Sequence, residues 1–208
     1  KLAAKLALGL AVVELAITGY AVSVFQASGP EAFYVFHSWI ESPKVSFHLG
    51  LDGLSLIMVL LTNFLTPIII LSAFNRNTPH AAGYFSLILL MQFALVGVFT
   101  AMDGLLYYIF WELALIPIYF IALRWGGANR VAITLKFFIY TLAGSLLMLF
   151  GFIMLYWYNP DQSFDIRELY RIYISDGNQS WLFWMFFLAF AIKIPIVPFH
   201  TLPLTSVS

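Results

Sequence analysis

The 208-residue sequence contains no cysteine and few charged residues. Without cysteine, the chain cannot form a disulfide or hold an iron–sulfur cluster on thiolates. Only 10% of the residues are charged and 62% are hydrophobic, with a mean hydropathy of +0.92. Soluble domains carry about 25% charged residues, so this composition excludes a water-soluble domain. The formal net charge is zero, which argues against a nucleic-acid partner.

Long apolar runs dominate the sequence instead. A hydropathy window of about 19 residues predicts membrane spans at residues 6–25, 51–74, 83–102, 105–123, 131–158 and 181–199. The predicted fold class is therefore all-α, a multi-pass transmembrane helical bundle of six spans that forms one domain over residues 1–208. Segments 26–50 and 159–180 are predicted to be loops, the second with a short surface helix around residues 166–173.

The lysine and arginine residues of the predicted loops indicate an orientation. Six spans place both termini on one side, and that side carries Lys1, Lys5, Arg76, Arg124 and Arg130. The opposite side carries Lys44, Arg167 and Arg171 among a larger number of acids. Because basic residues concentrate on the cytoplasmic side, the termini are predicted to be cytoplasmic. We expect an integral multi-pass protein of the bacterial inner membrane.

Three charged residues stand out within the predicted spans: Glu112, Lys136 and Lys193. A charge at the bilayer centre costs about 2.5–3.5 kcal/mol, and such residues usually have a function. With a rise of 1.5 Å per residue, Glu112 lies about 12 Å, Lys193 about 18 Å and Lys136 about 22 Å from the outer surface. The three are therefore expected in one band about 10 Å thick. The structural alternatives are a static ion pair and, for Lys136, a side chain that reaches the nearer surface.

An acid and an amine at this depth would control each other's charge. Removal from water favours the neutral amine, whereas a carboxylate about 4 Å away stabilises the ammonium by about 4 kcal/mol at an effective dielectric constant of 20. A movement of Glu112 relative to Lys193 would then decide whether the lysine keeps its proton. This arrangement predicts an element of a proton pump.

Two prolines follow Lys193 closely. Pro195 and Pro198 lack an amide proton, so the carbonyls of Ala191 and Ile194 are predicted to lose their helical partners. A helix interrupted at membrane depth is typical of ion sites in transporters. The alternative is an ordinary proline kink, which is common in membrane helices. We expect a discontinuous helix at Pro195–Pro198.

The histidines differ in their placement. His200 follows the predicted break and is a candidate proton relay, or else an interfacial histidine, because imidazole titrates near neutral pH. His37, His48 and His80 fall in predicted loops and are expected in solvent. A membrane haem needs two histidines on facing spans, so a cytochrome is disfavoured. No metal site is predicted.

The remaining polar residues, two glycines and Pro117 are assigned structural roles. Asp52 is predicted to cap the second span, and Pro117 to loosen the helix that carries Glu112. Helix packing is the predicted role of small and polar residues within the spans, namely Gln92, Thr100, Thr134, Thr141, Gly144, Ser145 and Gly151.

Four segments, in this order and spacing, are similar to one known family. They are LDGLSL at 51–56, FWEL at 110–113, LKFFIYTLAGS at 135–145 and AFAIKIPIVPFHT at 189–201. Together they resemble the antiporter-like subunits of proton-pumping NADH:quinone oxidoreductase (respiratory complex I), most closely those of the M type. The resemblance extends from about residue 45 to residue 201.

The resemblance implies a function and its residues. Glu112 and Lys193 would be the paired acid and base, accompanied by Lys136, in a membrane-arm subunit that translocates protons during quinone reduction. It implies no cofactor in this chain, with NADH, FMN, iron–sulfur clusters and quinone bound by other subunits. Its partners would be other membrane subunits, the lipid bilayer and protons. The sequence departs from the family pattern after Thr201 and lacks the family's second half, so we expect a fragment of a larger subunit.

Two other interpretations stay open. One is a subunit of a multisubunit cation/proton antiporter. Sodium prefers several oxygen ligands, and Glu112 is interpreted as the only acid within a span, which disfavours this interpretation. The other is a membrane scaffold or nonfunctional truncated fragment, in which Glu112 and Lys193 would be dispensable.

Overall fold

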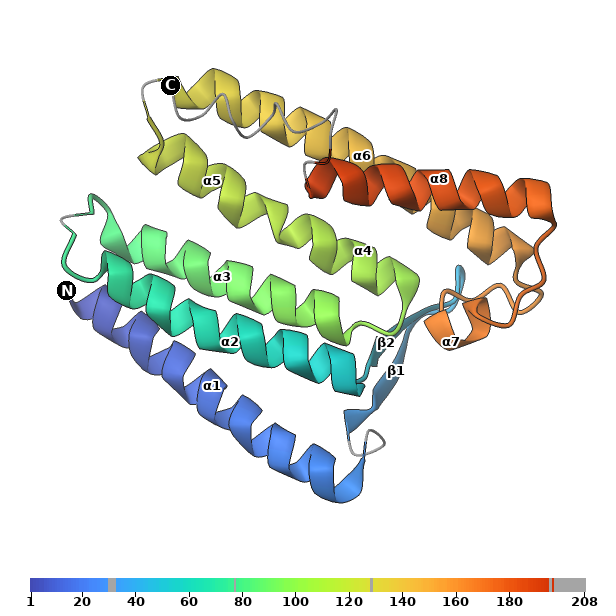
Figure 1. Ribbon diagram of the computed structural model, residues 1–208, viewed down its shortest axis with the longest axis horizontal. Coiled ribbons are helices and arrows are strands. Elements are labelled where there is room, and N and C mark those ends of the chain that lie inside the picture. The colour runs from blue at the N-terminus through green and yellow to red at the C-terminus, as the bar shows by residue number, and fades with distance from the viewer. Residues whose placement is uncertain (30–32, 77, 128, 195, 197–208) are drawn as a thin grey trace.

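The computed structural model describes residues 1–29, 33–76, 78–127, 129–194 and 196 (Figure 1). In chain order the elements are α1 (Leu2–Ser28), β1 (Val35–Ile40), β2 (Val45–Leu49), α2 (Gly53–Ala73), α3 (Ala81–Thr100), α4 (Gly104–Leu113), α5 (Leu115–Trp125), α6 (Arg130–Tyr158), α7 (Ile166–Leu169) and α8 (Asp176–Lys193).

The predicted fold class, a multi-pass helical membrane bundle, is confirmed. Within the described residues, five helical segments are long and apolar enough to cross a membrane: α1, α2, α3, α4 with α5, and α6. The predicted sixth span corresponds to α8, which is less apolar because it begins with the polar residues 176–180. Its crossing of the membrane stays a prediction. The predicted break at Pro195 and Pro198 lies outside the described residues.

The long helices lie side by side across the bundle (Figure 1). Contacts join α1 to α2, α2 to α3, α3 to α4 and α5, and α6 to α5, α4 and α8. The link between α3 and α4 is so short that the two helices are antiparallel neighbours, as predicted. The two-stranded sheet and α7 lie at the end of the bundle opposite the N-terminus, which we call the hairpin side (Figure 1).

Two glycines allow α6 and α8 to pack closely. A Cβ atom added to Gly144 of α6 would lie 2.9 Å from Ile192, and one added to Gly151 would lie 2.7 Å from Phe186. Both partners belong to α8, so these glycines let α8 approach the α6 backbone. Interfaces of this kind are common between membrane helices, and the predicted packing role of the two glycines is confirmed.

The prediction that residues 26–50 form only a loop is wrong. Strands β1 and β2 form an antiparallel hairpin with Val35 opposite Leu49 and Ile40 opposite Val45. Both strands are rich in the β-branched and aromatic residues that favour extended structure. The hairpin leads directly into α2, where the Asp52 side chain accepts a hydrogen bond from the Ser55 amide at 2.7 Å. This confirms the predicted cap.

Candidate functional site

Glu112 lies beside an interruption of its helix. α4 ends at Leu113 and α5 begins at Leu115, so the acid is the penultimate residue of α4. Pro117 is buried and has no amide proton to donate to the carbonyl of Leu113, which explains the interruption. The predicted loosening of this helix by Pro117 is confirmed.

Lys193 lies against the same part of α4. It is the last residue of α8, and its Nζ atom lies 4.4 Å from the ring centroid of Trp111. The Trp111 ring also packs edge-on against Phe190, one turn earlier in α8, with ring centroids 5.4 Å apart. Trp111 directly precedes Glu112, so the structure brings the two predicted residues to neighbouring positions.

Neither charged group is neutralised by a direct contact in the described part of the chain. Glu112 Oε1 and Lys193 Nζ are buried atoms without a hydrogen-bond partner. No ion pair within 4.0 Å joins them among the described residues. Lys193 still lies within the electrostatic reach of Glu112. Tyr108, one turn before Glu112, lies close to both the acid and Ser145 of α6. The acid and the amine therefore interact through space, at a separation that a small movement would change.

The backbone after Lys193 gives one of the two predicted carbonyls a non-helical partner. The Ile196 amide donates to the Ala191 carbonyl at 3.0 Å, and the Ile194 amide donates to the Phe190 carbonyl at 2.9 Å. The Ala191 carbonyl therefore accepts from an amide five residues ahead, in place of the helical amide that a proline at position 195 cannot supply. Pro195, Pro198 and His200 lie outside the described residues.

The structure does not bring Lys136 to the acid and the amine. Its side chain is exposed on α6, whereas Thr141 and Ser145 of the same helix are buried. Lys136 is five residues from Thr141, which places it about 140° around the helix axis. Lys136 was predicted at a depth similar to that of Glu112 and Lys193, but it lies on a different face of α6 from the buried Thr141 and Ser145.

Sequence reasoning missed a second carboxylate within the membrane. Glu14 lies in the middle of α1, in the first apolar run, where the same criterion that identified Glu112 could have found it. It lines a cavity of about 430 Å³ together with Thr18, Asn63 and Thr100 from α1, α2 and α3. The prediction that Glu112 is the only acid within a span is therefore wrong.

A chain of hydrogen bonds crosses the helices at this cavity. The Asn63 amide group donates to Thr18 Oγ1 at 2.7 Å, and the Gln92 amide group donates to Asn63 Oδ1 at 2.7 Å. Thr18, Asn63 and Gln92 are all buried, and Gln92 Oε1 has no partner among the described residues. The chain of hydrogen bonds therefore holds α1, α2 and α3 together.

Asp103 organises the hairpin side. Its Oδ1 atom accepts hydrogen bonds from the Leu105 and Leu106 amides, at 3.0 and 3.1 Å, and so caps α4. Its Oδ2 atom accepts from the Ser46 amide of β2 at 3.0 Å. Burial raises the pKa of Asp103, although the three donating amides act in the opposite direction. This one side chain therefore joins the hairpin to the start of the helix that carries Glu112.

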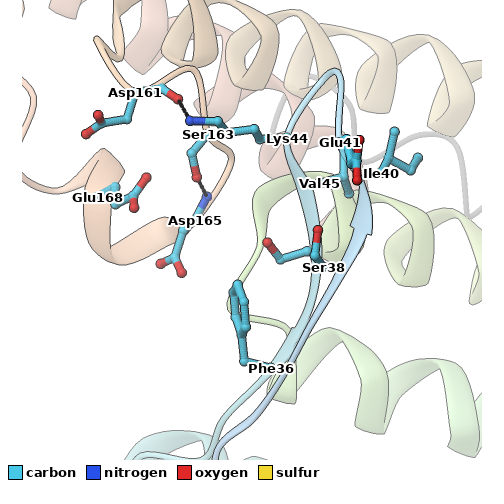
Figure 2. Close-up of a pocket in the computed structure, with 11 residues that line it drawn as sticks. Phe36, Ser38, Ile40, Glu41, Lys44, Val45, Asp161, Ser163, Asp165 and Glu168 are labelled. Carbon is cyan, nitrogen blue, oxygen red and sulfur yellow. Dashed lines mark hydrogen bonds between the residues drawn. The ribbon is translucent and has the colours of Figure 1, made fainter.

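A cavity of about 580 Å³ opens next to this junction, between the hairpin and the segment before α8. Figure 2 shows Lys44 donating to the Asp161 carbonyl, at 2.9 Å, and the Asp165 amide donating to the Ser163 hydroxyl, at 3.1 Å. Asp165 and Glu168 add carboxylates to its lining. Among the described residues, no group of three or more histidine and acidic side chains is arranged to hold a metal ion.

His48 was expected in solvent, and that prediction is wrong. The side chain is 1% exposed. It contacts Asp165 and Arg167, which follow it by 117 and 119 residues. No local pattern in the sequence reports a contact over that separation. His37 and His80 are exposed, as predicted.

Comparison with known proteins places this geometry in a family. A family profile described as "NADH:quinone oxidoreductase/Mrp antiporter, TM" matches residues 101–204, which is half of the chain. NADH-quinone oxidoreductase subunit M of Rickettsia conorii is 38% identical over 187 residues, which are 88% of this chain and 38% of the relative. F(420)H(2) dehydrogenase subunit M of Methanosarcina mazei is 38% identical over 195 residues, which are 90% and 39%.

A solved structure shows the same arrangement of helices. A chain of respiratory complex I from Thermus thermophilus with bound NADH matches with a TM-score of 0.79 and 27% identity. The match covers 97% of this chain and 45% of that chain. The chain thus spans less than half the length of each of these three relatives.

Proposed function

The chain belongs to the transmembrane family shared by NADH:quinone oxidoreductase and Mrp antiporter subunits, and from that membership we propose that it is a membrane-arm subunit of an NADH:quinone oxidoreductase. In this proposal it takes part in proton translocation coupled to quinone reduction. Its partners are the other membrane subunits, the surrounding lipid and protons. Its location is the bacterial inner membrane.

One observation carries the proposal: the buried atoms Glu112 Oε1 and Lys193 Nζ lie within electrostatic reach of each other, and no direct ion pair joins them in the described part of the chain. Glu112 and Lys193 come from α4 and α8, and each is at or next to the end of its helix. A pair closed at 4 Å would interact with about 4 kcal/mol at an effective dielectric constant of 20, and an open pair with much less. Small movements at the two helix ends can therefore change which protonation state of Lys193 is favoured.

The proposed roles follow from this coupling. Lys193 carries the proton, and Glu112 stabilises the protonated lysine when the two approach. Lys136 and His200 are relays to the rest of the pathway. Because Lys136 is exposed on α6, its role requires a covering helix from elsewhere in the assembly, since a lysine at this depth is unfavourable in lipid.

The redox chemistry belongs to other subunits. NADH, FMN, iron–sulfur clusters and quinone would act outside this chain, and the complex as a whole would be the enzyme. NADH as the electron donor rests on the names of relatives such as the Rickettsia subunit and the Thermus complex, whereas the Methanosarcina relative of equal identity is named for F(420)H(2).

Paired substitutions in the assembled complex test the proposal. Glu112→Gln and Lys193→Met are each expected to lower proton uptake by inverted membrane vesicles at least about tenfold, the effect of 1.4 kcal/mol on a rate. The exposed residues Glu41 and Lys5 provide the matched controls Glu41→Gln and Lys5→Met, with uptake unchanged. Normal proton uptake in both test variants would favour a scaffold or a nonfunctional fragment and would refute the proposal.

A subunit of a multisubunit cation/proton antiporter is the second candidate. The observation in its favour is Glu14, which with Thr18, Asn63 and Thr100 supplies the oxygen ligands that sodium prefers. Under this alternative, an imposed sodium gradient would drive proton movement in vesicles without any electron donor, and Glu14→Gln would abolish it. Proton movement that needs the electron donor and ignores sodium would exclude it.

A further inference from the structure

Both ring nitrogens of His48 are engaged by groups from one segment. Nδ1 lies 2.8 Å from Asp165 Oδ2, and Nε2 lies 3.0 Å from an Nη atom of Arg167. His48 is the penultimate residue of β2. Asp165 caps the N-terminus of α7, and Arg167 is the second residue of that helix. The imidazole therefore bridges the hairpin and α7 across the turn between α3 and α4.

The chemistry of the two partners defines the proton positions on the ring. A guanidinium group only donates hydrogen bonds, so Nε2 must accept from Arg167 and carry no proton. A carboxylate only accepts, so Nδ1 must carry the proton and donate it to Asp165. In this arrangement His48 is the neutral Nδ1–H tautomer, and Nε2 is its only site for a second proton.

Few charged groups lie near His48 in the described part of the chain. Asp165 Oδ1 accepts from the Arg167 amide at 2.9 Å and lies 3.6 Å from Arg167 Nε. Asp103 of the turn between α3 and α4 lies within electrostatic reach of Asp165. Tyr34, before β1, packs against the imidazole and also lies 5.2 Å below the Arg167 guanidinium. A proton on His48 would thus be attracted by Asp165 and repelled by Arg167.

We propose that His48 is a proton-binding site on the hairpin side, separate from Glu112 and Lys193, at which a proton and the Arg167 guanidinium compete for Nε2. When the ring binds a second proton, both nitrogens are donors and the contact with Arg167 is lost. The contact with Asp165 remains and becomes an ion pair. Arg167 can leave without burying its charge, because its side chain is 53% exposed.

Because a proton and Arg167 compete for Nε2 of His48, the contact between Arg167 of α7 and His48 of β2 depends on pH. At high pH, Arg167 and Asp165 both hold the imidazole, and α7 is tied to β2 at two points. At low pH only the Asp165 contact holds. Residues 170–175 lead from α7 into α8, whose last residue is Lys193. The local pH on the hairpin side is therefore sensed at the entry of the helix that carries the amine.

Nitrogen NMR of histidine-labelled chain in lipid nanodiscs tests the proposal. His37→Gln, His80→Gln and His200→Gln leave His48 as the only histidine, so its tautomer and titration are read directly. At neutral pH the Nδ1–H tautomer is expected. An Nε2–H tautomer in this otherwise native chain would overturn the proposal, whatever happens to further variants.

The competition itself is tested by removing Arg167. Arg167→Met is expected to raise the proton affinity of His48 about tenfold, because it removes both the competitor and a positive charge. Asp165→Asn is expected to lower it by a similar factor. Arg171→Met, at an exposed arginine two residues beyond α7, is the matched control and leaves the titration unchanged. An unchanged titration in the Arg167 variant would refute the competition.

Discussion

The Nζ atom of Lys193 lies 4.4 Å from the ring centroid of Trp111, the residue directly before Glu112. The aromatic face offers the ammonium a weak attraction, while Glu112 Oε1 has no hydrogen-bond partner among the described residues. The Trp111 ring thus provides a second contact for the ammonium when Lys193 is not paired with Glu112. Because no direct ion pair joins Glu112 and Lys193 in the part of the chain that the structure describes, the distance between the two groups can change.

Replacing Trp111 tests this cation–π contact with Lys193. A cation–π contact contributes about 0.5–2 kcal/mol, so Trp111→Leu should destabilise the chain by at least that amount, and Trp111→Phe by less. Thermal unfolding in lipid nanodiscs measures the difference. Trp157 is 76% exposed, so Trp157→Leu is the control and should cost little. Equal losses in the Trp111→Leu and Trp157→Leu variants would contradict the account.

The approach of α3 to α4 is tested at Gly97. A Cβ atom at this position would overlap the ring of Phe110, which lies two residues before Glu112. Gly97→Ala should therefore destabilise the chain by about 1–3 kcal/mol, the usual cost of overpacking. Phe110→Leu in the same chain should restore part of the loss.

Gly83 supplies the matched control on the same helix. A Cβ atom there meets nothing within 4 Å, so Gly83→Ala should be neutral or stabilise α3 by up to about 1 kcal/mol. Thermal unfolding of both variants compares the two directly. A Gly97→Ala variant as stable as Gly83→Ala would mean that α3 and α4 are farther apart than described.

Asp103 is predicted to join the hairpin to α4 through its second oxygen. In Asp103→Asn, the remaining oxygen can still cap α4 at the Leu105 and Leu106 amides, but the amide group faces the Ser46 amide, and two donors cannot bond. Hydrogen exchange should accelerate at Ser46 and stay slow in α4. Unchanged exchange at Ser46 would show that the hairpin is held by other contacts.

The cap of α2 predicts a pH dependence. The Ser55 amide that donates to Asp52 lowers the pKa of that carboxyl below its ordinary value. The contribution of Asp52 to stability is therefore fully present above the pKa of an unfolded aspartate, about 3.9, and is lost as the pH falls through the lower folded value.

Two substitutions separate the cap from its charge. Asp52→Ala should cost about 0.5–2 kcal/mol at neutral pH, the usual value of an N-cap. Asp52→Asn retains an acceptor and should keep most of the stability while removing the acid-dependent loss. Unfolding measured between pH 3 and 7 distinguishes the two. An acid-dependent loss that persists unchanged in Asp52→Asn would assign it to another group.

The helical bundle and the placement of Glu112 and Lys193 near each other could be predicted from the sequence, because both depend on strong local signals, whereas the roles of the two residues stay a prediction. Apolar runs define the membrane helices, and Glu112 and Lys193 are conspicuous within such runs. Glu14 carries the same signal and was overlooked. The short link at Asp103 determined the antiparallel pairing of α3 and α4 without any tertiary information.

Features that depend on distant contacts were not predictable in this way. The hairpin is stabilised by the Asp103 contact to Ser46, which joins residues 57 positions apart. His48 is buried by groups more than a hundred residues later. The exposure of Lys136 depends on how α6 is rotated, and depth along a helix carries no information about rotation. In each case the missing information was which distant part of the chain a segment packs against.

The charge state of the Lys193 amine is the most direct test of the central claim, that Glu112 controls whether this lysine holds a proton. Nitrogen NMR of lysine-labelled chain, with Lys193→Met to assign the signal, reads that state in the native chain and in Glu112→Gln. The account predicts that the amine loses its proton more readily once the carboxylate is removed, with no such change in Glu41→Gln. A Lys193 signal that titrates identically in the native chain and in Glu112→Gln would contradict it.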